Sequence, residues 1–452
     1  MASDWKPGRL RDIADVVMGQ SPTADYVNEA FQGKPLLNGP TEFGSINPTP
    51  VQFTTDVRKK ANPGDLLFCV RGSTTGRMNW ADQEYAIGRG LAAIRHRDGD
   101  AFQHFVRAVI ELKLPDLLAA ATGSTFPNVG RDQLLDIPAS IPPKGEQQVI
   151  SRFFKGIDDK IEINRRINQT LEAMARAIFK SWFVDFHPVK AKIAAIVEGR
   201  DPLRVAMSAL SGKPDAELDA LPPEQYEHLA AIAALFPDEM EESELGAIPR
   251  GWACGALGDI CSFTAGSAFK PEHQGSTEGD YPFIKVSDMN LAGNEVFIQS
   301  ANNYVSKAQQ SEMKAKLHPL GATVFAKIGV ALISNRRRLL TSPTIIDNNL
   351  MSASPVEGKS GKYFLYSLLS TLDFNTLVSG TALPYINVSD LKKIPIVRPP
   401  YDACLVFEAK ASSMFSMMQT LAAQSSTLAT TRDALLPRLL SGEIEASGTF
   451  EG

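Results

Sequence analysis

Residues 150–182 read ISRFFKGIDDKIEINRRINQTLEAMARAIFKSW, and this stretch carries one stripe of mostly apolar side chains. The stripe recurs at alternating steps of four and three residues over more than four heptads. This spacing favours a long helix that packs on a partner helix along a narrow seam; two ordinary long core helices are the alternative. At 1.5 Å per residue the helix measures roughly 50 Å. The stripe comprises Ile150, Phe154, Ile157, Ile161, Asn164, Asn168, Leu171, Ala175, Ile178 and Trp182.

A second stripe with the same spacing lies 257 residues further along the chain. It predicts the partner helix. Asn164 and Asn168 interrupt the first stripe, and polar residues at such positions tend to fix the register and the partner of a coiled coil. The second stripe comprises Phe407, Ala411, Met414, Met418, Leu421, Ser425, Leu428, Arg432, Leu435 and Leu439.

Each helix follows one copy of an internal repeat. Residues 64–143 and 321–400 match at a constant offset of 257, and the openings of the two copies match at an offset of 247. A ten-residue insertion in the second copy accounts for the difference. The repeat predicts two similar domains with pseudo-twofold symmetry. Matched pairs are Gly64 and Gly321, Phe68 and Phe325, Gly123 and Gly380, Pro127 and Pro384, and Trp5 and Trp252.

Each copy mixes short strands with one or two helices. The apolar runs 66–70 and 323–328 follow a glycine turn and predict buried strands. The stretches 101–114 and 361–374 occupy corresponding places and predict helices. We therefore expect an α+β fold with small mixed sheets in each copy. The turn that contains Gly123 and Gly380 precedes the shared proline.

Composition limits the class of protein without identifying it. The chain has 452 residues, 44% of them hydrophobic and 21% charged, which is typical of a globular protein of two or three domains. No apolar run approaches the ~20 residues of a membrane span, and the first residues lack an apolar signal core, so we expect a cytoplasmic protein. The net charge of −5 neither excludes nor supports DNA binding, because 187–247 alone holds 12 acidic and 5 basic side chains.

No motif indicates catalysis or metal binding. The chain lacks the GxxxxGK[ST] phosphate loop, the GxSxG elbow and HExxH, and its six histidines have no metal-ligand spacing. We therefore predict no catalytic residue and no metal site. The acidic, proline-punctuated segment 187–247 is interpreted as a connector with one short helix near 223–235.

The order of several local signatures along the repeated chain resembles the specificity (S) subunits of type I restriction-modification systems. The resemblance covers nearly the whole chain. No signature is specific alone. They are WKPGRLRDIADVVMGQSP (5–22), GDLLFCVRGSTTGR (64–77), FPNVGRDQLLDIPASIPPKGEQQVI (126–150), IDDKIEINRRINQTLEAMARAIFKSWFVDFHPV (157–189) and SELGAIPRGW (243–252).

The resemblance implies two target-recognition domains separated by two long antiparallel helices. Such subunits do no chemistry and have no cofactor of their own. They join two modification subunits, which methylate adenine with S-adenosylmethionine, and the complex recruits ATP-dependent, Mg²⁺-requiring restriction subunits. Each domain reads one half of a split, asymmetric site in double-stranded DNA, and the helices set the gap. No membrane is involved.

The resemblance and the repeat together assign six segments to the chain. They are a first recognition domain (1–145), a first long helix (146–186), the connector (187–247), a second recognition domain (248–401), a second long helix (402–441) and a tail (442–452).

Basic and amide side chains after the predicted buried strands are the candidate DNA contacts. Arg and Lys suit guanine and phosphate, and Asn suits adenine. Another basic run, Arg58 to Lys60, is a weaker candidate. The candidates are Arg71, Arg77, Asn79 and Arg89 in the first copy and Lys327, Ser334, Asn335, Arg336, Arg337 and Arg338 in the second.

Two other functions fit parts of the sequence. The chain could be the recognition part of a fused methyltransferase-nuclease, although the cofactor motifs of such an enzyme are missing. It could also be a coiled-coil scaffold that binds only proteins.

Overall fold

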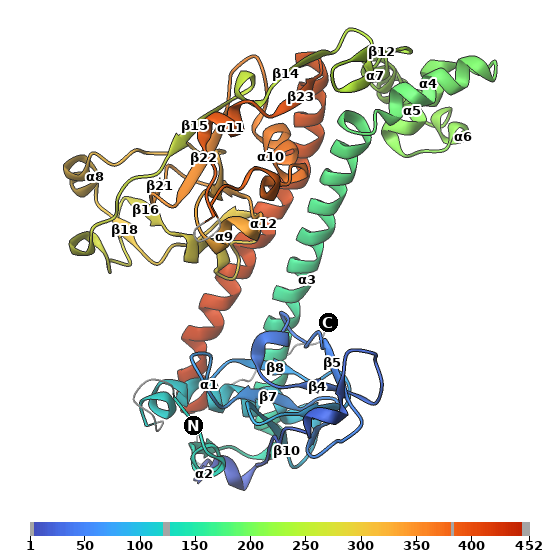
Figure 1. Ribbon diagram of the computed structural model, residues 1–452. Helices are drawn as coiled ribbons and strands as arrows, with labels where there is room; N and C mark the ends of the chain where they lie inside the picture. Colours follow the sequence, from blue (N-terminus) through green and yellow to red (C-terminus); the bar gives the residue numbers. More distant parts are fainter. Residues whose placement is uncertain (1–3, 121–126, 381–383, 445–452) are drawn as a thin grey trace. The chain divides into compact units, whose positions relative to one another are not determined.

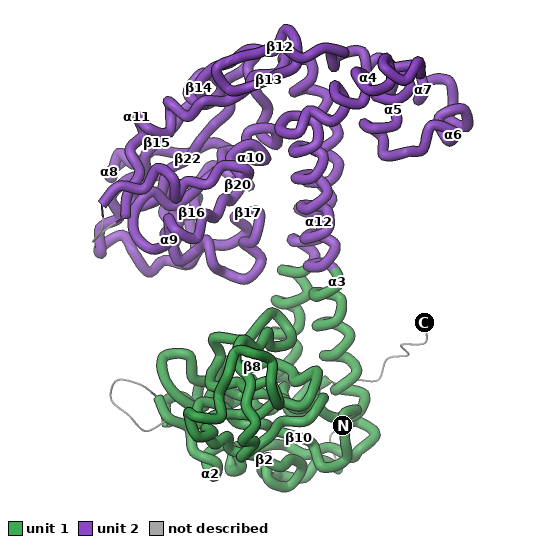
Figure 2. The backbone as a smooth tube through the Cα atoms, turned by 45° about the vertical axis from the view of Figure 1, so that its right-hand side comes forward, with its two compact units in different colours: residues 1–163, 425–452 green, residues 164–424 purple. Residues whose placement is uncertain are grey.

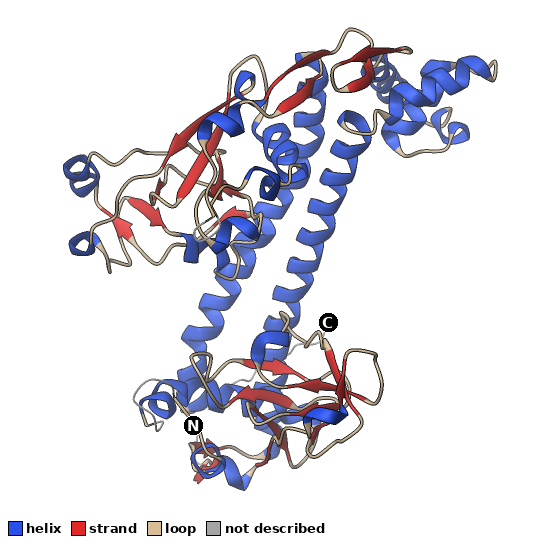
Figure 3. Cartoon of the chain, in the orientation of Figure 1, coloured by secondary structure: helices blue, strands red, loops and turns tan. Residues whose placement is uncertain are grey.

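The computed structural model describes residues 4–120, 127–380 and 384–444. The chain divides into two compact units (Figure 2). Unit 1 comprises 1–163 and 425–452, and unit 2 comprises 164–424. Each unit contains both helices and strands (Figure 3), in agreement with the expected α+β class. The turn predicted at Gly123, and most of the predicted tail, lie outside the described residues.

Unit 1 is built around β7 (Leu66–Cys69), the predicted buried strand. Leu66 and Phe68 point into a core that contains α1 (Gln103–Ala119), whereas Leu67 and Cys69 point into a second core on the other face. Alternation of side chains along a strand explains why an uninterrupted apolar run is needed here. The antiparallel sheet that contains β7 has the order β2 (Ala14–Met18), β10 (Leu91–His96), β7, β8 (Met78–Trp80).

A mixed sheet and a two-stranded ribbon complete the domain of unit 1. In the mixed sheet β4 and β9 pair in parallel. Its order is β3 (Val27–Asn28), β5 (Gln52–Thr54), β4 (Lys34–Leu37), β9 (Tyr85–Ile87), β6 (Lys60–Ala61). The ribbon is β1 (Lys6–Arg9) with β11 (Pro138–Ile141), and α2 (Arg131–Leu135) precedes β11.

Unit 2 repeats this arrangement, and its copy of the repeat contains the ten-residue insertion. Its main sheet has the order β15 (Cys261–Ala265), β22 (Leu350–Pro355), β19 (Thr323–Ala326), β20 (Arg338–Leu340), β17 (Phe297–Ile298). A smaller sheet holds β18 (Tyr304–Val305), β16 (Tyr281–Ile284) and β21 (Ile345–Ile346), and the ribbon is β14 (Ala253–Ala256) with β23 (Pro395–Arg398). The short helices of this second copy of the repeat are α8 (Lys307–Met313), α9 (Val330–Ile333), α10 (Lys362–Thr371) and α11 (Val388–Lys392).

The predicted repeat is confirmed element by element. β14 and β15 lie 247 residues after β1 and β2, and β19, α11 and β23 lie 257 residues after β7, α2 and β11. The extra ten residues of the second copy fall between β16 and β19. The parallel pair of β4 and β9 also recurs as β16 and β21.

The strand pairings correct the register in the middle of the repeat. β7 pairs Leu66 with Trp80, whereas β19 pairs Thr323 with Leu339. Since Leu66 and Thr323 match at an offset of 257, Trp80 and Leu339 match at 259. The same offset of 259 relates β10 to β22, and 257 returns at α11. The constant offset predicted from residue 64 is therefore wrong here, because the loop between β19 and β20 is two residues longer.

Two helices of 40 residues, α3 (Lys144–Phe183) and α12 (Tyr401–Leu440), realise the predicted stripes (Figure 1). Every position of both stripes is buried or half-buried. In unit 2, Asn164 donates from Nδ2 to Oε1 of Gln424 (2.9 Å), and Asn168 donates to the carbonyl of Met418 (3.1 Å). The falling partner numbers show that the helices pair antiparallel. Both interrupting asparagines thus bond to the opposite helix.

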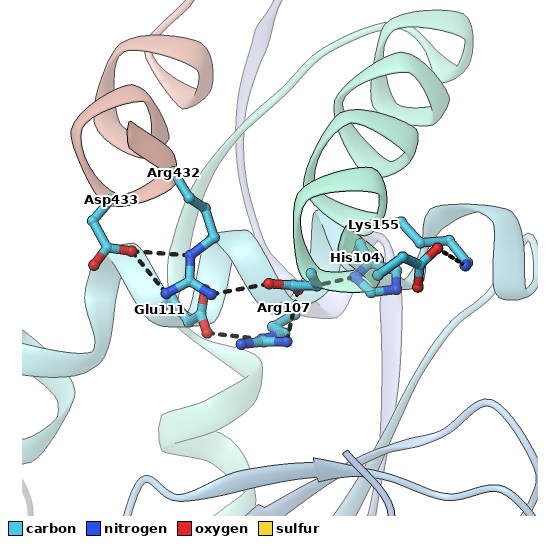
Figure 4. A network of polar contacts seen from close by, with 8 residues as sticks. His104, Arg107, Glu111, Lys155, Arg432 and Asp433 are labelled. Atoms are coloured by element: carbon cyan, nitrogen blue, oxygen red, sulfur yellow. Dashed lines mark hydrogen bonds and ion pairs between the residues drawn. The ribbon is translucent and has the colours of Figure 1, made fainter. Parts of the chain in front are cut away.

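In unit 1 one carboxylate joins three helices (Figure 4). Asp158 of α3 accepts hydrogen bonds from Arg107 of α1 (2.9 Å) and Arg432 of α12 (2.9 Å). Nδ1 of His104 lies 3.6 Å from the same carboxylate. Burial acts to raise the pKa of Asp158, but the neighbouring His104 imidazole and the two guanidinium groups outweigh it, so the pKa is lowered. The carboxylate therefore stays ionised between its cationic partners.

The segment predicted as a connector with one short helix is folded. It forms four helices and a hairpin, and Val189, Met207 and Phe236 enter the core of unit 2. Local signals explain α5, because the Asp201 carboxylate caps its first turn and Gly212 ends it with a φ of 72°. The predicted helix is α7. The elements are α4 (His187–Val197), α5 (Pro202–Ser211), α6 (Asp215–Leu218), α7 (Pro223–Ala234), β12 (Met240–Ser243) and β13 (Gly246–Pro249).

The substitution Asp158→Ala is expected to lower the free energy of unfolding by about 2–3 kcal/mol, because it removes two charge-assisted hydrogen bonds between helices, while Arg107 keeps Glu111 and Arg432 keeps Asp433. Denaturant unfolding followed by circular dichroism measures this change. Asp159→Ala is the matched control, since Asp159 is half-exposed and pairs with Lys155 on the same helix. The control should cost less than about 1 kcal/mol. Equal losses in the two variants would show that the network does not stabilise unit 1.

Candidate nucleic-acid interface

In unit 1 two of the four predicted contacts, Arg71 and Arg77, lie on the loop that joins β7 to β8. Gly72 and Gly76 adopt positive φ values of 87° and 92°, which tighten this loop at positions that only glycine occupies without strain. The loop is anchored on the segment before α2, because Nε of Arg71 donates to Oδ1 of Asn128 (3.2 Å) and the Thr75 hydroxyl donates to the carbonyl of Pro127 (3.0 Å). The structure therefore presents the loop in one defined shape.

Three predicted residues of unit 1 are exposed and one is not. The side chains of Arg71 and Arg77 are exposed on the loop, and Arg89 is exposed on the turn between β9 and β10, where its Nε donates to the Ser21 hydroxyl (3.4 Å). Asn79 is buried, and its amide donates to the carbonyl of Gly44 (3.0 Å). Asn79 thus holds the domain together and is removed from the set of candidate DNA contacts.

In unit 2 the equivalent loop, between β19 and β20, contains five of the six predicted residues, and the sixth, Arg338, is the first residue of β20. Lys327 is half-buried and Ser334 is exposed. Asn335 has a left-handed φ of 54°, and its Oδ1 accepts from the backbone of Phe374 (3.1 Å). Arg336 is exposed and donates to the side chain of Asn290. Asn335 therefore shapes the loop, whereas Arg336 projects from it.

The three consecutive arginines do not form one surface cluster, which corrects the sequence interpretation. Arg337 is only 4% exposed. It donates to Oδ1 of Asn335 (2.9 Å) and to the carbonyl of Leu372 (3.1 Å), and its guanidinium carbon lies 3.8 Å from the ring centroid of Phe374. Burial lowers the pKa of Arg337 to about 10, so it remains charged at neutral pH. Arg336 is exposed, Arg337 is buried and Arg338 is half-buried, so the three do not share one exposed face.

Arg338 is half-buried beneath the same loop. It donates from Nε to the carbonyl of Met289 (3.2 Å) and from Nη1 to the carbonyl of Arg337 (2.8 Å). Burial also lowers its pKa. Of the three arginines, Arg336 is the one whose side chain the structure presents to solvent.

The strand register makes Arg77 and Arg336 equivalent positions. They match at the local offset of 259, one residue before the equivalent pair Met78 and Arg337. Among the described residues no carboxylate lies within ion-pair distance of Arg77, Arg89 or Arg336. By contrast, two residues of the weaker candidate run are paired with carboxylates: Arg58 with Asp56 (2.7 Å) and Lys60 with Glu84 (2.6 Å). The exposed arginines are thus the better anion-binding groups.

The same offset identifies a position that sequence analysis missed. Arg89 matches Asn348, which with Asn349 forms the exposed turn between β21 and β22. Asn349 donates to the Asp347 carboxylate (3.3 Å). The constant offset of 257 hid this match, whereas the two-residue difference between the strand loops would have shown it.

Comparisons with known proteins identify the family of the chain. The family profile for the type I restriction modification DNA specificity domain matches residues 2–173 and 249–425, which are the two copies of the repeat and part of each long helix. The chain belongs to this family. It is a specificity subunit of a type I restriction-modification system, with two recognition domains, and the folded insert between them lies outside both matched regions.

Full-length relatives show the same extent of similarity. The chain is 31% identical to the type I restriction enzyme HindI specificity subunit of Haemophilus influenzae, over 98% of this chain and 100% of the relative. It is 24% identical to the MjaIX specificity subunit of Methanocaldococcus jannaschii, over 98% and 94%. The crystal structure of the type I restriction-modification S subunit from M. genitalium aligns over 96% of each chain, at 14% identity and a TM-score of 0.48.

Two further properties concern the described residues alone. None of their helices has both the length and the apolar character that a bilayer crossing requires. Their His, Cys, Asp and Glu side chains form no cluster of three or more that could hold a metal ion.

The substitution Arg337→Ala is expected to lower the free energy of unfolding by about 2–3 kcal/mol, because it removes a buried stack on Phe374 and two buried hydrogen bonds of a charged donor. Arg336→Ala is the matched control, and as an exposed substitution it should change stability by less than about 0.5 kcal/mol. Denaturant unfolding of the two variants compares them. If Arg337→Ala is as stable as the parent, Arg337 is not the internal support described above.

Proposed function

We propose that each recognition domain reads one half of a split, asymmetric site in double-stranded DNA, through the loop after β7 or β19 and the turn before β10 or β22. The observation that carries this proposal is the equivalence of Arg77 and Arg336. In both domains the same position of the same loop presents an exposed arginine without a carboxylate partner among the described residues. Such a guanidinium group suits a phosphate or the major-groove edge of guanine.

Differences between the loops support the reading of two different half-sites. The first loop carries serine and threonine hydroxyls beside Arg71, and its neighbouring turn carries Arg89. The second domain has aliphatic residues in the loop and Asn348 at the position of Arg89. Arginine pairs best with guanine and asparagine with adenine. One framework therefore presents two sets of base-contacting groups, as an asymmetric site requires.

The long helices act as the spacer between the two half-sites. Each helix belongs to both units, since α3 passes from unit 1 to unit 2 at residue 163 and α12 passes back at 424. A continuous helix resists bending, and the antiparallel pairing seen within each unit joins α3 to α12. The number of helical residues between the domains thereby sets the gap between the half-sites.

The chain contributes recognition and scaffolding, and its partners contribute the chemistry. Two modification subunits dock on it and methylate adenine with S-adenosylmethionine, and restriction subunits that use ATP and Mg²⁺ join through the complex. The chain needs no cofactor for this role, and it acts in the cytoplasm. The family resemblance supports these assignments.

In the assembled complex, Arg77→Ala and Arg336→Ala are each expected to weaken DNA binding. A lost phosphate contact should reduce the slope of log K against log salt by about 0.9, and a lost guanine contact should relax specificity at one base pair by about 1–3 kcal/mol. Salt-dependent binding to the cognate duplex measures both. Arg58→Ala is the control, because Arg58 is already paired with Asp56. Parental affinity in both variants would contradict the proposed interface.

Insertion of seven residues in heptad register after both Ile163 and Gln424 is expected to lengthen the gap in the recognised site without changing either half. Seven helical residues add about 10 Å, which corresponds to about three base pairs at ~3.4 Å each. Sequencing of methylated adenines in cells that express the variant with its partner subunits measures the gap. An unchanged gap would rule out the helices as the spacer.

A further inference from the structure

The second recognition domain exposes aliphatic side chains at the tip of the loop between β19 and β20. We call this loop, and the equivalent loop between β7 and β8, the reading loop of its domain. Val330 is 80% exposed and Ile333 is 51% exposed, both on α9. Leu332 on the same helical turn is buried in the core of unit 2. The turn therefore buries one aliphatic side chain as an anchor and presents two others to solvent.

The exposed pair is held in place by the surrounding backbone. The backbone N–H of Gly329 donates to the carbonyl of Pro384 (2.7 Å), and the carbonyl of Ile333 accepts from Nδ2 of Asn375 (3.3 Å). Asn335 closes the loop with its left-handed backbone and its bond to Phe374. Side chains that are fixed before binding lose less entropy when they contact a ligand. The exposure of Val330 and Ile333 is thus a property of a defined loop.

The charge around the pair identifies an anionic partner. Arg336 is exposed three residues after Ile333, and the segment from Lys327 to Leu340 contains no aspartate or glutamate. A surface that combines exposed aliphatic groups with an exposed arginine suits the major groove, where phosphates flank the apolar methyl group of thymine.

The equivalent loops of the two recognition domains carry different kinds of side chain. In the first domain the loop runs from Arg71 to Arg77 through glycine, serine and threonine only. Hydroxyl groups can bond to phosphates and to the polar edges of several bases. An isolated aliphatic side chain cannot do so. The C5-methyl group of thymine is the feature of the major groove that it can recognise by direct contact.

We propose that Val330 and Ile333 read the 5-methyl group of thymine in the half-site bound by the second domain. This proposal rests on the proposed function and adds a specificity determinant to it. Arg336 would supply the neighbouring polar or phosphate contact, and the aliphatic pair would select thymine over cytosine.

Duplexes that carry deoxyuridine in place of single thymines test the proposal, because deoxyuridine pairs as thymine does but lacks the methyl group. The recognised site is first mapped by methylated-adenine sequencing, and affinities are then measured with the assembled complex. At one or two thymines of the second half-site, deoxyuridine should weaken binding by roughly fourfold per methyl, the change that corresponds to about 0.8 kcal/mol. In the first half-site the same replacements should have no dependence on Val330 or Ile333.

Serine variants connect the effect to the loop. Val330→Ser and Ile333→Ser should bind the thymine duplex more weakly by a similar factor and should no longer distinguish thymine from deoxyuridine. Leu320→Ser is the matched control, since Leu320 is 58% exposed but precedes β19, at the other end of that strand. The control should keep the parental affinity and the parental discrimination. A circular dichroism spectrum of each variant verifies that it is folded.

Three results would overturn the proposal. The first is equal binding of thymine and deoxyuridine throughout the second half-site, and the second is a second half-site made only of G·C pairs. The third is weaker binding by the serine variants with discrimination intact, which would place the aliphatic pair against a protein subunit. In all three the complex still binds its site, so the proposed function stands. Absence of any sequence-specific binding would instead overturn the proposed function as well.

Discussion

The packing of α3 against α12 is the constraint on which both domains depend. Residues from the end of the chain, including Leu436 and Leu439, complete the core of unit 1, and Phe179 and Trp182 of the first helix complete the core of unit 2. Neither core can close until segments far apart in the sequence have met. Because such long-range contacts cost loop-closure entropy before they are rewarded, the stability of each domain is coupled to the seam.

The two ends of the seam differ in chemistry although they descend from one repeat. At the offset of 257, Asp158 corresponds to Phe415 and Arg432 corresponds to Ala175. Unit 1 therefore closes with an ion-pair network, whereas unit 2 closes with aromatic packing, in which Tyr363 stacks on Phe415 at 4.4 Å between centroids. If α3 packed on a second α3 in the same register, Asp158 would face Ala175 and would lose Arg432. Asp158 would keep Arg107 but lose one of its two guanidinium partners, which costs stability for a largely buried carboxylate, so the difference favours the pairing of α3 with α12.

Much of this arrangement follows from the sequence, because periodicity and repetition reflect the backbone. The helices predicted at 146–186 and 402–441 end within three residues of α3 and α12, since the apolar stripe is a direct signature of the seam. The contacts of individual side chains were harder to predict from the sequence. Arg337 stands between two other arginines in a surface-like run, and only its contacts in the folded loop show that it turns inward against Phe374. Asn79 is polar and adjacent to a loop, yet it is buried and its amide donates to a carbonyl of a distant turn.

The reading loops show how one framework can hold different chemistry. In unit 1 the N–H of Val129 donates to the carbonyl of Val70 (3.0 Å), and in unit 2 the N–H of Ile386 donates to the carbonyl of Lys327 (3.0 Å), at the same offset of 257. Both anchors are backbone hydrogen bonds, which any non-proline residue can make. Side chains at the tip can therefore change from hydroxyl to aliphatic without loss of the anchor. Two loops that began alike can in this way diverge in what they contact, while the strands, the turn before α2 or α11 and the helix seam keep the same geometry.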